Sequence, residues 1–231
     1  MDSPITVIGG TGSVGRLVVQ RLLDRGETVR AVGRNGQRAR RNLPDGAVFH
    51  TGDVRDAASL AEPLAGCSAI VYSVEPGTAN SGPESPKSTM YQGIRNALAA
   101  ATAHGERPHF VLVSQIYVTR HDHPINAWGR MLDWRLAGED ELRDSGLPYT
   151  VVRPGWLTGS RPKGQRIRLE QGDRGEGSVA RADVAEAVVQ ALYQPAATGL
   201  TFEIFNEAGP ETADWAELFD GLDRAPVAQR S

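Results

Sequence analysis

The residues best suited to bind a ligand are the glycines of the stretch VIGGTGSVGR, residues 7–16. Gly10, Gly12 and Gly15 form G-x-G-x-x-G, the general dinucleotide fingerprint. Counted from Gly9, the same stretch forms G-x-x-G-x-x-G, a related loop. Glycines at either spacing let the backbone turn tightly and let a pyrophosphate approach, and the helix that follows offers unpaired N–H groups. The stretch predicts a bound dinucleotide; the alternative is a turn that serves only the packing of a helix on a strand.

The end of the second predicted strand indicates which dinucleotide fits. At this place a carboxylate accepts hydrogen bonds from the ribose of NAD, whereas an arginine accommodates the 2′-phosphate of NADP. The strand ends in AVGRN, with Arg34 in the relevant place and no acid beside it. A guanidinium pairs with a phosphate through two hydrogen bonds, and a carboxylate would repel it. Arg34 therefore predicts NADP(H); Arg38, Arg40 and Arg41 either add to its positive field or are simply solvated.

Apolar strand patterns alternate with helical patterns along most of the chain. We expect strands at 5–10, 28–34, 47–53, 68–74, 109–118 and 149–155, and helices at 13–26, 38–44, 56–66, 90–104 and 129–146. This alternation predicts an α/β fold, a doubly wound parallel sheet of the Rossmann type, because each crossover helix packs back onto the sheet. Shorter strands and turns follow at 166–180, then a helix at 182–194, a strand at 201–206 and a helix at 212–222.

Length and composition narrow the classes of protein that fit. A chain of 231 residues favours a single domain, residues 1–231, in which 156–180 and 198–222 form a small C-terminal extension on the substrate side. The net charge of −3 argues against a nucleic-acid partner, and no run of residues predicts a signal peptide or a membrane span. Cys67 is the single cysteine, which excludes an internal disulfide and a cysteine-based zinc site. We expect a cytoplasmic protein without a metal, acting as a monomer or homodimer.

Several motifs in order identify a family. They are VIGGTGSVGR, VRAVGRN, GDVRD, MYQGIRNALAAA, FVLVSQ, YTVVRPG and ARADVAEAVVQAL. Together they resemble the atypical short-chain dehydrogenase/reductases, the NAD(P)-binding group that includes NmrA-like and biliverdin-reductase-like proteins. The resemblance extends from about Ile5 to Leu222.

The resemblance implies a role for individual residues in holding the cofactor. It selects the spacing that starts at Gly9, with Gly12 and Gly15, and it implies adenine contacts at Asp53. The remaining cofactor-binding positions that it implies are Thr11, Ser13 and Val14 in the glycine loop, Val54 beside Asp53, Ser73 and Val74 at the ribose, and Ser114, Pro154 and Gly155 around the nicotinamide. It also implies that Asp183 opens a helix as its N-cap.

The catalytic positions of the family are where this sequence differs. Family members that reduce carbonyls by the usual route carry Tyr-x-x-x-Lys after the fifth strand, and the lysine lowers the tyrosine pKa for proton transfer. Alignment of WRLAGEDEL places Met131 at the tyrosine and Arg135 at the lysine. Methionine cannot transfer a proton, whereas Arg135 keeps a positive charge that could hold the nicotinamide ribose. The usual tyrosine-dependent mechanism is therefore absent from its usual place.

Tyr117 is the candidate replacement for the missing proton donor. Strand alternation would place Ser114 and Tyr117 on opposite faces, which counts against a shared role unless the strand has already ended. Solvent could instead protonate a stabilised product. The loop 75–89 and the segments 115–128 and 156–177 are expected to surround the substrate. Within them, the residues predicted to contact it are Gln115, Trp128 and Trp156.

These observations favour an NADP-dependent reductase of a small conjugated or aromatic molecule. Ser114, Tyr117 and Arg135 are its candidate catalytic residues. The absence of the tyrosine–lysine pair leaves two alternatives open. One is a regulatory protein that senses NADP without turning it over, and the other is an epimerase or dehydratase that uses the same pocket.

Overall fold

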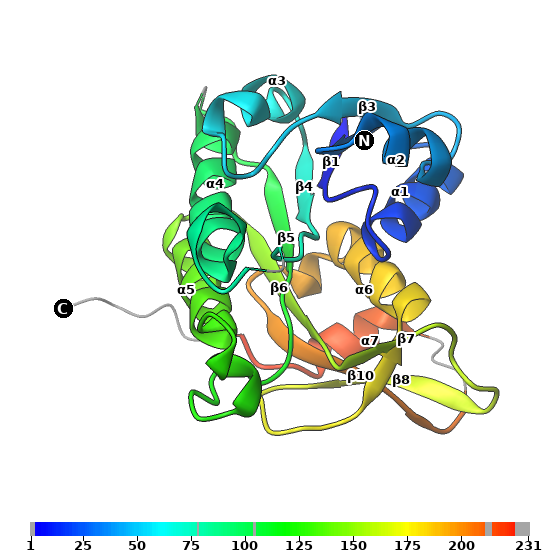
Figure 1. Cartoon of the computed structure of the whole chain (residues 1–231). Coiled ribbons are helices and arrows are strands. Elements are labelled where there is room, and N and C mark those ends of the chain that lie inside the picture. Colours follow the sequence, from blue (N-terminus) through cyan, green and yellow to red (C-terminus); the bar gives the residue numbers. More distant parts are fainter. Residues whose placement is uncertain (1–2, 78, 104, 211–213, 225–231) are drawn as a thin grey trace.

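The core of the molecule is one large sheet, seen in a computed structural model that describes residues 3–77, 79–103, 105–210 and 214–224. Eight strands lie in the order β3-β2-β1-β4-β5-β6-β10-β8 (Figure 1). Their bounds are β1 Ile5–Ile8, β2 Val29–Gly33, β3 Val48–Thr51, β4 Ala69–Tyr72, β5 His109–Val113, β6 Tyr149–Pro154, β8 Gln165–Glu170 and β10 Thr201–Ala208. Every neighbouring pair is parallel except β10 and β8. The predicted doubly wound sheet is confirmed.

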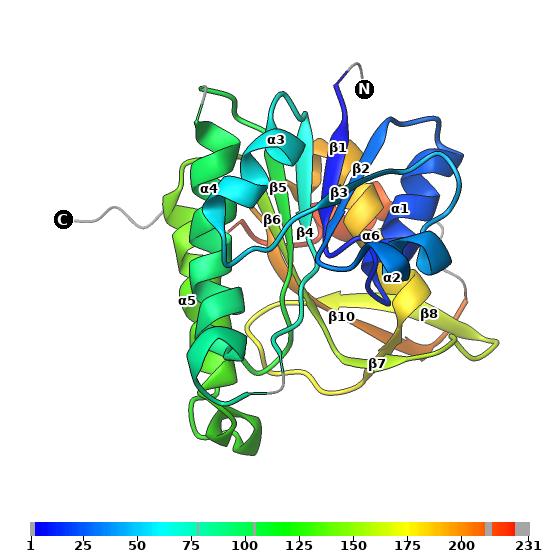
Figure 2. The same cartoon turned by 45° about the horizontal axis from the view of Figure 1, so that its top comes forward.

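Helices cover both faces of this sheet (Figures 1 and 2). On one face lie α1 Gly15–Asp24, α6 Arg181–Tyr193 and α7 Trp215–Asp220; on the other lie α3 Ala61–Leu64, α4 Gly93–Thr102 and α5 Met131–Asp144. Successive strand residues point to opposite faces, so Val7 packs into one core cluster and Ile8 into the other. The strands are apolar on both sides for this reason.

Shorter elements complete the fold. They are the helix α2 Gly36–Asn42, the 3₁₀ turns Ala57–Leu60, Gly82–Glu84, Pro124–Ala127 and Pro195–Ala197, and a π-helical turn Lys87–Gln92. A separate parallel pair consists of β7 Trp156–Thr158 and β9 Ser178–Ala180. Of the two segments expected on the substrate side, 156–180 supplies this pair and β8, while 198–222 places β10 inside the large sheet. Among the described residues, no helix is both long enough and apolar enough to cross a membrane.

Three local expectations change in the structure. The helix expected at 90–104 starts as the π-helical turn and becomes regular only at Gly93; residue 104 lies outside the described residues. The segment 56–66 divides into a 3₁₀ turn and α3, although Asp56 does cap it. Asp183 is not an N-cap, because α6 already begins at Arg181. Its carboxylate instead accepts a hydrogen bond from Asn206 at 2.8 Å, which ties the first turn of α6 to β10.

Candidate functional site

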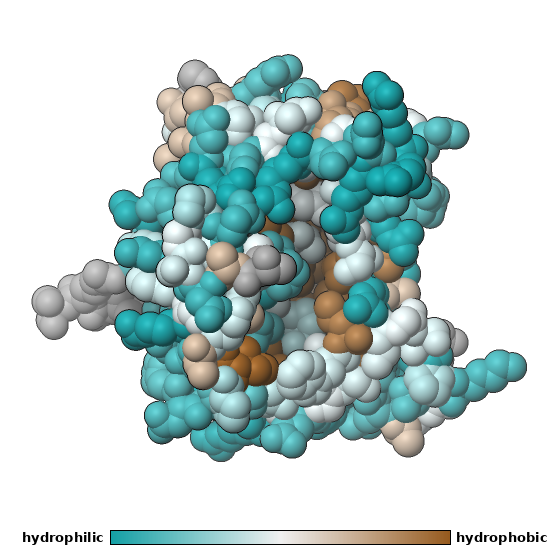
Figure 3. Space-filling model, in the orientation of Figure 1, coloured by the Kyte–Doolittle hydropathy of each residue, from teal (hydrophilic) through white to brown (hydrophobic). Residues whose placement is uncertain are grey.

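A cleft of about 1110 Å³ lies at the carboxyl ends of the parallel strands, where open α/β sheets bind their ligands. In Figure 3 this face is hollowed near its centre, and hydrophobic and hydrophilic side chains both edge the hollow. We call the part of the cleft beside Arg34 and Asp53 the β2 end. The part beside Ser114, Tyr117 and Trp156 is the β6 end.

The glycine loop between β1 and α1 has no room for a side chain at Gly9 or at Gly15. Gly9 has a positive φ of +83°, and a Cβ there would lie 2.1 Å from the Ser73 carbonyl oxygen. A Cβ on Gly15 would lie 2.3 Å from the Gly9 carbonyl oxygen, so the start of α1 packs directly on the loop. Gly9 and Gly12 line the cleft, whereas Gly10 packs against Ala31 of β2. Gly9 and Gly12 therefore face the cleft with bare backbone, which fits the approach of a pyrophosphate, while Gly15 lets α1 pack on the loop.

The cleft brings together nearly all of the residues singled out from the sequence. Those that line it are Gly9, Thr11, Gly12, Ser13, Val14, Arg34, Asp53, Val54, Ser73, Val74, Ser114, Gln115, Tyr117, Arg135, Pro154, Gly155 and Trp156. Of the described residues that were predicted to contact a ligand, Gly15 and Trp128 do not line it. Trp128 follows the 3₁₀ turn Pro124–Ala127, whose residue Ile125 takes the place at the cleft. The substrate contact expected at Trp128 stays a prediction.

At the β2 end, arginines and carboxylates form a network that is between a quarter and about half exposed, called the exposed network below. Arg55 donates to both oxygens of Asp53, at 2.9 and 3.0 Å from Nε, and also pairs with Glu84. The hydrogen bonds from Arg55 are the main reason that the pKa of the Asp53 carboxyl is lowered. Arg34 Nη1 lies 3.4 Å from Glu84 Oε2, and both side chains are about half exposed. Of the three further arginines considered in the sequence, Arg38 also lines the cleft, whereas Arg40 and Arg41 are not among the lining residues.

At the β6 end, the chain leaves the sheet earlier than expected. β5 ends at Val113, so Ser114 and Tyr117 are no longer on alternating strand positions, and both line the cleft. Tyr117 has φ +73°, a backbone conformation that bulky residues rarely adopt. Its ring stacks on His123, with centroids 4.5 Å apart, and lies 6.3 Å from the Trp156 ring. The objection from strand alternation therefore does not apply to Tyr117.

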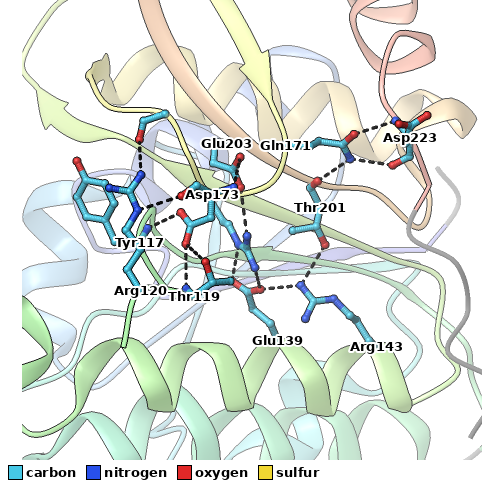
Figure 4. Close-up of polar contacts among 12 residues, drawn as sticks. Tyr117, Thr119, Arg120, Glu139, Arg143, Gln171, Asp173, Thr201, Glu203 and Asp223 are labelled. Carbon is cyan, nitrogen blue, oxygen red and sulfur yellow. Dashed lines mark hydrogen bonds and ion pairs between the residues drawn. The ribbon is translucent and has the colours of Figure 1, made fainter. Parts of the chain in front are cut away.

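Asp173 holds the backbone of this loop in place (Figure 4). Its carboxylate accepts from the Tyr117 N–H at 2.5 Å and from the Thr119 N–H and hydroxyl at 2.9 Å each. Its own N–H donates to Glu203 at 3.0 Å. The unusual conformation of Tyr117 is thus fixed by a buried carboxylate from another segment, as strained backbone near functional sites commonly is.

Beneath Asp173 lies a buried network of charged side chains. Arg153 of β6 contacts Glu139 of α5 at 2.7 Å and Glu203 of β10 at 3.2 Å, and the exposed fractions of these three side chains are 7, 0 and 1%. Burial alone would raise the pKa of the Glu139 carboxyl, but the charges of Arg153 and Arg143 outweigh it and the pKa is lowered. For Glu203 burial prevails, so its pKa is raised.

Arg135 and Met131 lie one turn apart on α5, and both line the cleft. Arg135 is buried, with 3% of its side chain exposed, and its Nη2 lies 2.5 Å from the Glu75 carboxylate. Its Nε is also buried and has no hydrogen-bond partner within the described part of the chain. A cation thus stands at the aligned lysine position, while no proton-transferring group stands at Met131.

Sequence reasoning missed four residues that shape this site, namely Glu75, Glu139, Arg153 and Asp173. Arg153 offered a signal, because an arginine inside the buried strand YTVVRPG requires a buried anion. The identity of that anion was not predictable, since Glu139 and Glu203 come from other elements. Across the described residues, no cluster of three or more His, Cys, Asp or Glu side chains could hold a metal ion.

Comparison with known proteins agrees with this geometry. A family model described as NAD(P)H-binding matches residues 9–195. The chain is 30% identical over 245 residues to the chloroplastic protein At2g37660 of Arabidopsis thaliana, covering 94% of this chain and 75% of that protein. It is 27% identical over 259 residues to the sanguinarine reductase of Eschscholzia californica, covering 93% and 94%. The solved structure of ChuY, an anaerobillin reductase of Escherichia coli, matches with a TM-score of 0.72 at 23% identity, covering 88% of this chain and 97% of that one.

Proposed function

The chain belongs to the NAD(P)H-binding family, within the atypical short-chain dehydrogenase/reductases, and on this premise we propose that it is an NADPH-dependent reductase of a small aromatic or conjugated molecule. The observation that supports this most is the continuous cleft. At one end it has a glycine cradle and two arginines, and at the other it has the aromatic side chains of Tyr117 and Trp156. A cytoplasmic location and the choice between monomer and homodimer stay predictions.

Three features of the β2 end support NADPH rather than NADH. Arg34 directly follows β2 and lines the cleft, Arg38 of α2 lines it as well, and no carboxylate follows β2 directly. Guanidinium groups bind phosphates through charge-assisted hydrogen bonds, which the 2′-phosphate of NADP would receive and NAD would not. Asp53 and Val54 would then contact the adenine.

A bound nicotinamide cofactor supplies a hydride to an electrophilic carbon of the substrate. The chain itself must orient the substrate and supply or admit a proton. We assign the proton to the Tyr117 hydroxyl, because Asp173 fixes the Tyr117 backbone and His123 stacks on its ring. Ser114 would orient the nicotinamide or the substrate, and Gln115 and Trp156 would contact the substrate body.

The test of turnover is to mix the protein with NADPH and a panel of quinones, flavins and enones, and to follow the absorbance of NADPH. We expect oxidation with at least one of them, and a loss of rate in Tyr117→Phe. A second candidate function, nucleotide sensing without turnover, is favoured by Met131, which lines the cleft in place of the family tyrosine. Tight NADPH binding without oxidation of any compound would favour that candidate and contradict the reductase.

The cofactor choice has its own test. Arg34→Asp should weaken NADPH binding by about tenfold or more and leave NADH binding nearly unchanged, because only the 2′-phosphate loses a charge-assisted contact. Arg41→Asp is the matched control, because this substitution makes the same change in net charge. Arg41 is exposed on α2 and is not among the residues that line the cleft. Equal losses for both cofactors in Arg34→Asp would contradict the assignment.

A further inference from the structure

The ion pair at the β6 end joins two side chains of very different exposure. Arg135 is 3% exposed, whereas its partner Glu75 is 69% exposed, and both line the cleft. We propose that the substrate carries an anionic group, a carboxylate or sulfonate on an aromatic body, which takes the place of Glu75 on Arg135. This inference rests on the proposed function, whose substrate class it narrows.

The first step of the argument concerns the cation. A guanidinium that is taken out of water must be paired with an anion, because an unpaired buried charge is strongly unfavourable. Arg135 is buried on α5 and receives its charge partner from outside the helix, at the end of β4. Its Nε remains buried without a hydrogen-bond partner among the described residues. The cleft therefore contains a buried guanidinium that has one carboxylate partner and one nitrogen still without a hydrogen-bond acceptor.

The second step concerns the partner. Glu75 keeps most of its surface in water, so its carboxylate can return to solvent at little cost when another anion takes its place. Arg135 then stays paired, because the ligand's anion replaces the carboxylate. A carboxylate on Arg135 shows that the guanidinium is accessible to an oxyanion from the cleft side. Glu75 thus occupies the position that a ligand anion would take.

The third step concerns the surroundings of the pair. Besides Met131, the residues that line the same cleft include Ile116, Ile125, Tyr117 and Trp156. The first three of these pack in one cluster with Leu132 of α5, the helix that carries Arg135. Apolar and aromatic walls of this kind fit a flat hydrophobic body, and they strengthen an ion pair by excluding water. A body of that shape with one anionic group matches both the walls and the cation. The family resemblance implies a different role for Arg135, contact with uncharged ribose hydroxyls, and the two roles are separable by charge.

The experiment uses two dyes that share one aromatic body. 8-Anilinonaphthalene-1-sulfonate carries the anion, and N-phenyl-1-naphthylamine lacks it; each is titrated by fluorescence into the full chain saturated with NADP⁺. Wild-type protein should bind the sulfonate more tightly. Glu75→Gln should raise affinity for the sulfonate by about two- to fivefold without changing affinity for the neutral dye, because the competing carboxylate is gone. Glu62→Gln, which removes an 88% exposed carboxylate on α3, is the matched control and should change neither.

Arg135→Gln should abolish the preference for the sulfonate, a loss of about tenfold or more. If thermal unfolding shows that this variant does not fold, the titrations of Glu75→Gln still test the proposal. The side chain of Glu75 is mostly exposed, so this substitution should leave the protein folded. Three results would each overturn the proposal. The first is equal binding of the two dyes by the wild type, and the second is no effect of Glu75→Gln on affinity for the sulfonate. The third is an Arg135→Gln variant that loses affinity for NADP⁺ but keeps the preference for the sulfonate. All arms measure binding alone, so absence of NADPH oxidation bears on the reductase and not on this site.

Discussion

Two arginine–carboxylate networks flank the cleft, and they differ in burial. At the β2 end, Arg55 links Asp53 to Glu84, and the exposed fractions of these side chains are 25, 27 and 45%. At the β6 end, Arg153 links Glu139 to Glu203, and all three side chains are at most 7% exposed. The two networks contain the same chemical groups but differ in how far their side chains are exposed to water.

Because they differ in burial, the two networks have different roles. Exposed ion pairs contribute little to stability, because water and salt screen them. Their charges stay available to a ligand. Breaking a buried pair leaves an unpaired charge in an apolar interior, so the buried network is a fixed support. It carries Asp173 and, through it, the backbone of Tyr117.

The largest expected effect comes from removing the central arginine of the buried network. Arg153→Met should lower the free energy of unfolding by about 3–5 kcal/mol, because Glu203 loses the cation with which it pairs and Glu139 keeps only Arg143. Arg55→Met, the same substitution in the exposed network, should change it by about 1 kcal/mol or less. Urea unfolding followed by circular dichroism measures both. Similar losses of unfolding free energy in the two variants would contradict the expected difference between the buried and the exposed network.

The two carboxyls of the buried network should respond to pH with opposite signs. The lowered pKa of Glu139 means that its contribution to stability is present above the ordinary glutamate pKa and is lost as the pH falls toward the folded-state value. The raised pKa of Glu203 means that its ionisation opposes folding as the pH rises past the ordinary value.

We therefore expect the destabilisation by Glu139→Gln to be largest at neutral pH and to shrink in acid. The destabilisation by Glu203→Gln should be smaller at neutral pH than in acid, and should grow as the pH is lowered. Urea midpoints between about pH 4 and 7 span the ordinary range of glutamate. Parallel pH profiles of the two variants would show that the carboxyls do not differ as described.

The two ends of the cleft also differ in how far the sequence predicts them. The glycine loop, Arg34 and Asp53 follow consecutive strands, so local motifs and the parallel sheet suffice to bring them together. At the β6 end, Asp173 contacts Tyr117 across 56 residues and Glu203 contacts Arg153 across 50. No local pattern encodes such partners. The early end of β5 was missed for the same reason, since the loop that follows it is held by Asp173 from another segment.

The smallest expected effect lies in the exposed network and concerns Glu84, which pairs with Arg34 and Arg55. If Arg34 binds the 2′-phosphate, Glu84 competes with that phosphate for the same guanidinium. Glu84→Gln should then tighten binding of 2′-AMP by about two- to fivefold and leave 5′-AMP nearly unchanged, a difference that calorimetric titration measures. Equal gains for both nucleotides would indicate only a general change in charge, and no gain would show that Glu84 does not obstruct Arg34. A selective gain would show that the exposed network can exchange its own carboxylate for the phosphate of a ligand, which a buried network cannot do without the large loss expected for Arg153→Met.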